Sequence, residues 1–372
     1  METNKVVTLD RPGGALSVRE QPMPKPQRDN LLVRVELSGV CATDLHIYQG
    51  DIPGFRYPVT PGHEIVGTVA EAGEDFTSDV TGRAVHPGDR VVVMPATPDG
   101  TCPSCRRAGP VPDCDNFDVI GFSVPEERRA GGGWGQYVLC NSSRARVFVT
   151  EANPEAAVLA EPASTPVEGM RRGGVTFGDS VLVQGTGTIG LLAVAAAKAL
   201  GAARVVAIGG PERRLRIAEE LGADTTISIE GTPDPGERVE LARAASPGGL
   251  GFDAVAECVG APAVLPEGLS CLRKGGTYLE LGHFSDVGEA TINPYRHLLA
   301  KDARLVAVSG YTPESFHRAL LMVERLGTAA ESLVTHRLPM SRAREAVNAL
   351  APGRRYMLDG SEVGKIVIDP RL

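Results

Sequence analysis

The chain of 372 residues is more than twice as long as a typical domain of about 150 residues, so we expect two domains. Hydrophobic residues make up 42% of the chain and charged residues 23%, a globular composition that excludes a wholly disordered or fibrous protein. The 38 Lys and Arg residues against 46 Asp and Glu residues give a net charge of −8, which disfavours nucleic acids and anionic membranes as partners.

The ends and the cysteines of the chain give no sign of secretion. Residues 1–7 lack the basic-then-apolar pattern of a signal peptide. The most apolar stretch, 189–203, contains Lys198 and is too short to span a bilayer. Seven cysteines are an odd number, which favours free thiols or metal thiolates over a disulfide framework. We therefore expect a cytoplasmic protein without a membrane segment.

Residues 1–155 carry short β-type runs separated by proline and glycine. These features predict an antiparallel, barrel-like β domain. The clearest runs are 31–37, 65–70, 90–94 and 135–139.

From Ser180 onward the pattern changes to alternating strands and helices. Such alternation predicts a parallel, doubly wound sheet, here over 156–311. The strand of 364–369 stands alone, so we expect the tail of 312–372 to return to the first domain. The expected strands are 181–184, 204–208, 226–229, 254–258, 276–282 and 304–309, with helices to residue 200 and over 214–221 and 313–326, and loops at 231–236 and 246–251.

A glycine-rich turn connects the first of these strands to its helix. Gly185, Gly187 and Gly190 have the spacing of a dinucleotide-binding loop, with Thr188 and Ile189 at the start of the helix. The first glycine forms the tight turn, the second lets the backbone approach a pyrophosphate, and the third allows close packing of helix and strand. We expect NAD or NADP to bind here.

The end of the second strand bears on the choice of cofactor. No carboxylate follows the strand directly, and Gly209 and Gly210 leave room for a larger group. Arg213 and Arg214 are available for a 2′-phosphate, which favours NADP. Glu212 offers a ribose contact instead, so NAD remains an alternative.

Two short segments contain the groups that a catalytic zinc needs. Cys41 supplies a thiolate, and His63 with Glu64 supplies an imidazole and a carboxylate. Three such ligands leave one coordination position open for a substrate. Taken singly, each group has an ordinary alternative, because Cys41 fits a buried apolar position and His63–Glu64 fits a surface pair.

The motifs taken together resemble a known family. They are Cys-x-Thr-Asp-x-His, Pro-x-x-x-Pro-Gly-His-Glu-x-x-Gly, Pro-Gly-Asp-Arg-Val, the glycine-rich turn and the terminal Gly-Lys-Ile-Val-Ile. In this order they resemble the zinc-dependent medium-chain dehydrogenases. Glu161-Pro162 is similar to the motif of the sorbitol, threonine and glucose dehydrogenase branch. The resemblance implies a GroES-like β-barrel catalytic domain over 1–155, a Rossmann dinucleotide-binding domain over 156–311, and a return to the catalytic domain over 312–372.

The resemblance also implies metal ligands. Cys41 and His63 would bind zinc directly. Glu64 and Glu161 would be either direct ligands or exchangeable partners of a bound water, and the sequence leaves open which of them binds directly.

Three residues next to Cys41 receive catalytic roles by the same resemblance. Thr43 would hydrogen-bond the substrate oxygen, and His46 would pass the proton through the cofactor ribose to solvent. Asp44 would orient the ligand imidazole, although a carboxylate at this position also fits the start of a helix.

A second cysteine group departs from the family pattern. Cys102, Cys105 and Cys114 resemble its structural zinc lobe, which four cysteines close. Ala108 stands where one cysteine is expected, so the lobe either recruits Asp113, Asp115 or another side chain, or has lost its metal. A structural site needs a closed tetrahedral shell. We therefore expect one catalytic zinc per chain and an empty lobe.

The expected activity is hydride transfer between NAD(P) and a secondary alcohol, such as a polyol or sugar-like compound, to give a ketone or aldehyde. One alternative is a zinc-free reductase of quinones or enones, which the complete ligand set disfavours. Another is a non-catalytic nucleotide-binding protein, which Thr43 and His46 disfavour. The substrate itself cannot be read from the sequence. We expect a homodimer or homotetramer.

Overall fold

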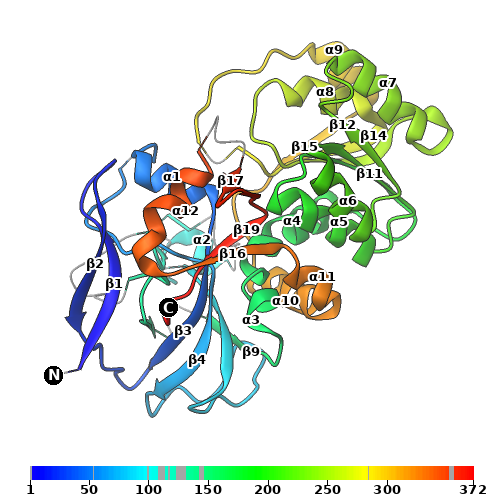
Figure 1. Ribbon diagram of the computed structural model, residues 1–372. Coiled ribbons are helices and arrows are strands. Elements are labelled where there is room, and N and C mark those ends of the chain that lie inside the picture. Colours follow the sequence, from blue (N-terminus) through cyan, green and yellow to red (C-terminus); the bar gives the residue numbers. More distant parts are fainter. Residues whose placement is uncertain are drawn as a thin grey trace. The chain divides into compact units, whose positions relative to one another are not determined.

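The computed structural model describes residues 2–52, 54–98, 100–107, 114–115, 118–122, 131–141, 146–283, 285–351 and 356–372. The chain forms two compact units, drawn in Figure 1, of which unit 1 comprises 1–161 with 312–372 and unit 2 comprises 162–311. The first junction falls after Glu161, later than residue 155, because helix α3 and the start of helix α4 belong to unit 1.

Unit 1 is built around a seven-stranded sheet. Its hydrogen-bonded order is β16-β19-β3-β4-β5-β9, and β8 also pairs with β3. Neighbouring strands are antiparallel except β16 and β19, so the end of the chain pairs with β3 near its beginning. The strands of unit 1 are β1 (Thr3–Leu9), β2 (Leu16–Pro22), β3 (Asn30–Val40), β4 (Ile65–Ala72), β5 (Arg90–Met94), β6 (Ala96–Thr97), β7 (Asp118–Val119), β8 (Tyr137–Asn141), β9 (Arg146–Val149), β16 (Val334–Leu338), β17 (Met357–Leu358), β18 (Ser361–Glu362) and β19 (Lys365–Ile368).

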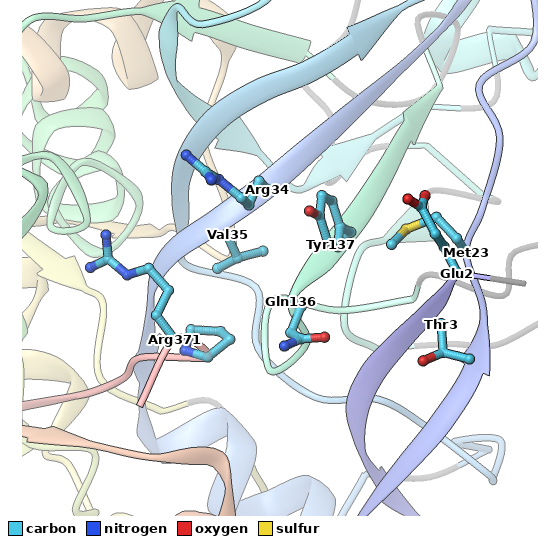
Figure 2. Close-up of a pocket in the computed structure, with 9 residues that line it drawn as sticks. Glu2, Thr3, Met23, Arg34, Val35, Gln136, Tyr137 and Arg371 are labelled. Carbon is cyan, nitrogen blue, oxygen red and sulfur yellow. The ribbon is translucent and has the colours of Figure 1, made fainter.

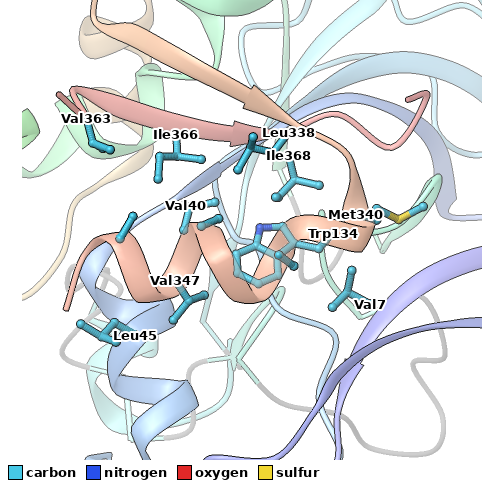
Figure 3. Packing of buried hydrophobic residues seen from close by; sticks show 13 residues of the cluster. Val7, Val40, Leu45, Trp134, Leu338, Met340, Val347, Val363, Ile366 and Ile368 are labelled. Atoms are coloured by element: carbon cyan, nitrogen blue, oxygen red, sulfur yellow. The ribbon is translucent and has the colours of Figure 1, made fainter. Parts of the chain in front are cut away.

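A buried apolar cluster joins the C-terminal segment to the end of β3 (Figure 3). Trp134 is fully buried there, and its Nε1–H donates to the carbonyl oxygen of Gly39 at 3.3 Å. Val40, Val347 and Ile366 belong to the same cluster. These contacts fix the backbone immediately before Cys41.

The helices of unit 1 are α1 (Ala42–Gln49), α2 (Pro103–Arg106), α3 (Pro154–Ala157), the first turn of α4 (Ala160–Gly173), α10 (Pro313–Leu326), α11 (Thr328–Glu331) and α12 (Ala343–Ala349).

Unit 2 is a six-stranded parallel sheet in the order β12-β11-β10-β13-β14-β15. Helices α5 and α6 pack together, and α7 packs with α8 against the buried cluster that contains Leu182 and Val255. The elements are β10 (Ser180–Gln184), α5 (Thr188–Ala199), β11 (Arg204–Gly209), α6 (Glu212–Glu220), β12 (Thr225–Ser228), α7 (Pro235–Ala245), β13 (Phe252–Glu257), α8 (Val264–Cys271), β14 (Leu272–Glu280), α9 (Pro294–His297) and β15 (Arg304–Ala307).

The order of these strands creates a switch point between β10 and β13. The chain moves outward from β10 to β11 and β12, then returns to β13 on the opposite side of β10. Loops that follow the two strands therefore diverge, and such a crevice at the carboxyl ends is the usual ligand site of a doubly wound sheet. The glycine-rich turn follows β10 directly.

The structure also shows where the sequence reasoning missed an element boundary. The segment 231–236 is not entirely loop, because α7 begins at Pro235, where Asp234 caps the helix by accepting from the Glu237 backbone N–H. In the part of the chain that the structure describes, no helix is long and apolar enough to cross a membrane.

Candidate metal and dinucleotide sites

Cys41 is held at the start of α1 by the hydrogen bonds of that helix. Its Sγ accepts from the Thr43 backbone N–H at 3.3 Å, and the Asp44 carboxylate accepts from the Cys41 backbone N–H at 2.9 Å. Together these bonds form a capping box, with cysteine in the place that serine or threonine usually takes. The thiol therefore has a fixed position, and Asp44 does occupy the helix-start role that its sequence position suggested.

His63 and Glu64 lie immediately before β4 and face Cys41. Cys41 Sγ is 3.2 Å from His63 Nε2. Sulfur and nitrogen bound tetrahedrally to one zinc lie about 3.6 Å apart, so a small opening admits the ion. Ligand atoms of Cys41, His63 and Glu64 all lie within 4.8 Å of one another. A thiolate, an imidazole and a carboxylate are a donor set that suits zinc.

The far side of the His63 ring faces Asp44. His63 Nδ1 and Asp44 Oδ1 are 3.8 Å apart, and within the described residues neither atom has a hydrogen-bond partner although both are buried. Burial raises the pKa of Asp44. Burial alone would lower the pKa of His63, but the charges of Cys41 and Asp44 outweigh it and raise that pKa well above the ordinary value. The pair has the composition of a carboxylate that orients a metal-bound imidazole.

Lys365 is a residue of this site that the sequence reasoning did not identify. Its Nζ, on β19, lies 2.6 Å from Glu64 Oε1 and 2.5 Å from Oε2, and both side chains are buried. Burial alone would lower the pKa of Lys365. The negative charges of Glu64, Cys41 and Glu161 outweigh burial, so the pKa is raised above its ordinary value. Lys365 therefore remains charged and compensates one negative charge in a group of several acidic donors.

Glu161, Thr43 and His46 are the remaining residues that the resemblance assigned to the site. Glu161 is in the first turn of α4, and its charge also contributes to raising the pKa of His63, after Cys41 and Asp44. It is not in the group of three whose ligand atoms lie within 4.8 Å. Thr43 and His46 lie on α1, and His46 Nδ1 is 3.1 Å from Asp51 Oδ2. The sequence reasoning did not include Asp51.

Aromatic side chains flank the imidazole. The Phe122 ring lies edge-on to His63, with centroids 5.1 Å apart and an interplanar angle of 85°. Phe55 lies 6.4 Å from Phe122 and 5.1 Å from Tyr57, measured between ring centroids. These rings provide an apolar surface beside the metal donors.

A separate pocket on unit 1 shares no residue with the metal donors. Figure 2 shows the arginine side chains on one side of it and Glu2 on the other. We assign this pocket no part in the chemistry at Cys41 and His63. Its lining residues are Glu2, Thr3, Met23, Arg34, Val35, Gln136, Tyr137, Pro370 and Arg371.

The glycine-rich turn of unit 2 has the shape that a pyrophosphate requires. Gly185 has φ +98°, in the left-handed region that favours glycine. A Cβ at Gly190 would collide with the Gly185 carbonyl oxygen, whereas a Cβ at Gly187 would meet open space. The N-cap of α5 is Gly187, which has no side chain to accept from the first turn of Thr188 and Ile189, so the backbone N–H groups there are available to an anion. These features fit a bound dinucleotide.

The two arginines considered for binding a 2′-phosphate differ in their exposure to solvent. Arg213 is exposed at the start of α6, whereas Arg214 is only 7% exposed. Glu212 is exposed and pairs with Arg216 at 3.7 Å. A Cβ at Gly209 would collide with the side chain of Thr186, so this position does not tolerate a carboxylate without rearrangement. Gly210 donates its backbone N–H to Thr186 Oγ1 at 3.1 Å.

The three lobe cysteines also come together. Ligand atoms of Cys102, Cys105 and Cys114 lie within 4.8 Å of one another. The backbone N–H groups of Cys105 and Asp115 lower the pKa of the Cys102 thiol. Ala108 and Asp113 lie outside the described residues, so the expected absence of a fourth ligand stays a prediction.

Comparison with known proteins identifies the family. Residues 27–149 match the family model of the alcohol dehydrogenase GroES-like domain, and residues 188–325 match that of zinc-binding dehydrogenases. The chain is 31% identical to erythritol/L-threitol dehydrogenase of Mycolicibacterium smegmatis and 30% identical to sorbitol dehydrogenase of Ovis aries, with 91% of each chain covered in both cases.

Solved structures agree with this assignment. An alcohol dehydrogenase of Thermotoga maritima superposes with a TM-score of 0.91 at 25% identity, covering 99% of this chain and 100% of that one. A zinc-binding dehydrogenase of Sinorhizobium meliloti 1021, bound to NADP, has a TM-score of 0.83 at 29% identity, and both chains are covered fully. This chain belongs to the zinc-dependent medium-chain alcohol dehydrogenase family. It is therefore an oxidoreductase with a GroES-like domain and a Rossmann domain.

Zinc binding should depend on pH because zinc must displace a proton from His63. With its pKa raised well above the ordinary value, His63 is still protonated above about pH 6.5, so zinc affinity should keep rising with pH beyond that point. Chelator-competition titration of the metal-stripped protein measures this. Asp44→Asn removes one of the charges responsible and should shift the rise to lower pH. An affinity that is constant above about pH 6.5 would contradict the assignment.

Proposed function

We propose that this oxidoreductase interconverts a secondary alcohol and its ketone, with NADP as the preferred cofactor and one zinc held by Cys41 and His63. The observation that carries the proposal is the convergence of Cys41, His63 and Glu64 in unit 1. The open turn at Gly187 in unit 2 supports the cofactor. Unit 1 is accordingly proposed as the catalytic domain and unit 2 as the dinucleotide-binding domain.

Each residue of the site has a distinct role in this proposal. A bound zinc supplies Lewis acidity that lowers the pKa of an alcohol or polarises a carbonyl, and the nicotinamide exchanges the hydride. Cys41, His63 and Glu64 would hold the ion, while Asp44 would orient the His63 ring. Glu161 would take the place of Glu64 or hold a water. Lys365 weakens Glu64 as a donor by sharing its charge.

Proton movement involves α1. Thr43 hydrogen-bonds the substrate oxygen, and His46 carries the proton toward solvent. Asp51 accepts from His46 Nδ1 at 3.1 Å and holds the ring in one orientation. The Asp51 side chain is half-exposed, so the His46–Asp51 pair is in contact with solvent.

The proposed substrate is a secondary alcohol with an apolar face, of the polyol or sugar-like class or of similar size. Phe55 and Phe122 provide the apolar surface beside the donors. The relatives include dehydrogenases of sorbitol, of erythritol and L-threitol, and of 5-exo-hydroxycamphor, all of which carry secondary hydroxyl groups. A zinc-free enone reductase does not need the buried thiolate, imidazole and carboxylate, and a regulatory nucleotide-binding protein does not need Thr43 and His46.

Removal of a metal donor should abolish turnover. Cys41→Ser or His63→Ala should eliminate alcohol-dependent reduction of the cofactor, while dissociation constants for NADP stay within about threefold, because the nucleotide loop is in the other compact unit. His46→Ala should be milder, since a proton relay contributes about 10²–10⁴-fold at most. Steady-state kinetics and cofactor fluorescence provide the two measurements. Full activity in either donor variant would refute the zinc assignment.

The cysteine lobe should hold no zinc. Zinc content per chain should be the same in the unmodified protein and in Cys105→Ser, because three thiolates do not close a tetrahedral shell. Cys41→Ser, by contrast, should lower the zinc content. Elemental analysis of the three proteins after identical dialysis measures their zinc content per chain. A loss of one zinc in Cys105→Ser would show that another residue completes the lobe.

Cofactor preference should depend on Arg213. This residue is exposed at the start of α6, and the related Sinorhizobium meliloti structure contains NADP. A charge-assisted hydrogen bond is worth about 1.5–3 kcal/mol, so Arg213→Ala should raise the KM for NADP at least tenfold and leave the KM for NAD nearly unchanged. Arg216→Ala is a control on the same helix, because that arginine pairs with Glu212. A strong preference of the unmodified enzyme for NAD would contradict the proposal.

We also infer a homodimer or homotetramer. β15 is the last strand of its sheet and pairs only with β14 among the described strands. Such an edge offers unpaired backbone groups to a second chain. Leu305 on β15 and Leu299 shortly before it are 49% and 77% exposed, so a second chain at this edge would cover apolar side chains.

A further inference from the structure

Two glutamates and a histidine form a group at the carboxyl edge of the parallel sheet. Glu257 is the last residue of β13, Glu280 is the last residue of β14, and the two are register partners. His283 follows three residues after Glu280. None of them belongs to the Cys41 group or to the glycine-rich turn.

The donor atoms have the spacing that a single metal ion would impose. His283 Nδ1 lies 2.9 Å from Glu280 Oε1 and 3.3 Å from Glu257 Oε2. One ligand atom from each residue can be chosen so that all three lie within 4.8 Å of one another. Donors bound to one cation at about 2.1 Å, at tetrahedral to octahedral angles, lie about 3.0–3.4 Å apart. The group needs little movement to bind a cation.

One carboxylate oxygen of the group is buried without a hydrogen bond. Glu257 is fully buried, and its Oε1 accepts from the backbone N–H groups of Val259 and Gly260 at 2.5 and 2.8 Å. Its Oε2 points at the group and makes no hydrogen bond within the described part of the chain. The only side-chain cation near either carboxylate there is His283, whose Nδ1 already contacts Glu280. Two acidic groups thus share at most one positive charge.

We propose that Glu257, Glu280 and His283 bind a divalent cation. Two carboxylates and an imidazole, without a thiolate, suit Mn²⁺ or a cation of similar hardness, whereas the thiolate of Cys41 selects zinc. The remaining coordination positions would be filled by water. The group shares no residue with the Cys41 group, but it lies at the carboxyl edge of the sheet, where β13 also borders the crevice assigned to the dinucleotide.

Mn²⁺ titration of the zinc-loaded protein tests the proposal. Loading the cofactor-free protein with one equivalent of zinc, which the thiolate site takes first, and then removing any excess leaves the second group unfilled. Electron paramagnetic resonance of free Mn²⁺ then reports additional binding. We expect one equivalent of Mn²⁺ to bind, and Glu280→Gln and His283→Gln each to weaken binding at least tenfold. His86→Gln is the matched control, because His86 also lies three residues from a carboxylate, with Nδ1 3.5 Å from Asp89 Oδ2, but has no second carboxylate within ion-pair distance among the described residues.

The outcomes separate this proposal from the dehydrogenase assignment. Binding that His86→Gln retains and the two group variants lose would support the site. Absence of Mn²⁺ binding, or binding unchanged in both group variants, would overturn it. His283 is partly exposed, so His283→Gln keeps the test valid even if Glu280→Gln fails to fold. Neither result alters the zinc content or the effect of Cys41→Ser on turnover.

Discussion

The architecture of unit 1 depends on compensating several acidic donors that are buried together. Asp44 and Glu64 are each 1% exposed, and the ligand atoms of Cys41, His63 and Glu64 lie within 4.8 Å of one another. Isolated buried charges are costly, so such a group persists only with cations nearby. Lys365 provides one from the last strand of the sheet, and a bound zinc would provide the rest. The return of the chain end to β3 is therefore a requirement of the site as well as of the fold.

Unit 2 meets the charge of a pyrophosphate by backbone geometry. A dinucleotide carries negative phosphates, and the turn after β10 meets them with the uncapped N-terminus of α5. Close packing at Gly190 and open space at Gly187 distinguish structural glycines from the one that faces a ligand. The two units thus handle charge in opposite ways, with side-chain cations around buried acids in unit 1 and oriented peptide groups in unit 2.

The sequence predicted a helix correctly where residues next to it cap or end the helix. Helix α10 runs over Pro313–Leu326 as expected, because Thr312 caps it and Gly327 ends it. Contacts between distant segments were not predictable. The Lys365–Glu64 pair spans 301 positions, and the Glu257–Glu280 register depends on sheet order. The sequence also placed Arg213 and Arg214 together, whereas the helix buries one and exposes the other.

X-ray absorption at the zinc edge tests the central claim most directly, because it reports which atoms surround the ion. The measurement uses zinc-loaded Cys105→Ser protein, so that the cysteine lobe cannot supply three thiolates. A single sulfur neighbour at about 2.3 Å, accompanied by nitrogen and oxygen neighbours at about 2.0–2.2 Å, is the result expected for Cys41 with His63 and a carboxylate. A zinc without any sulfur neighbour, or with several, would contradict the account.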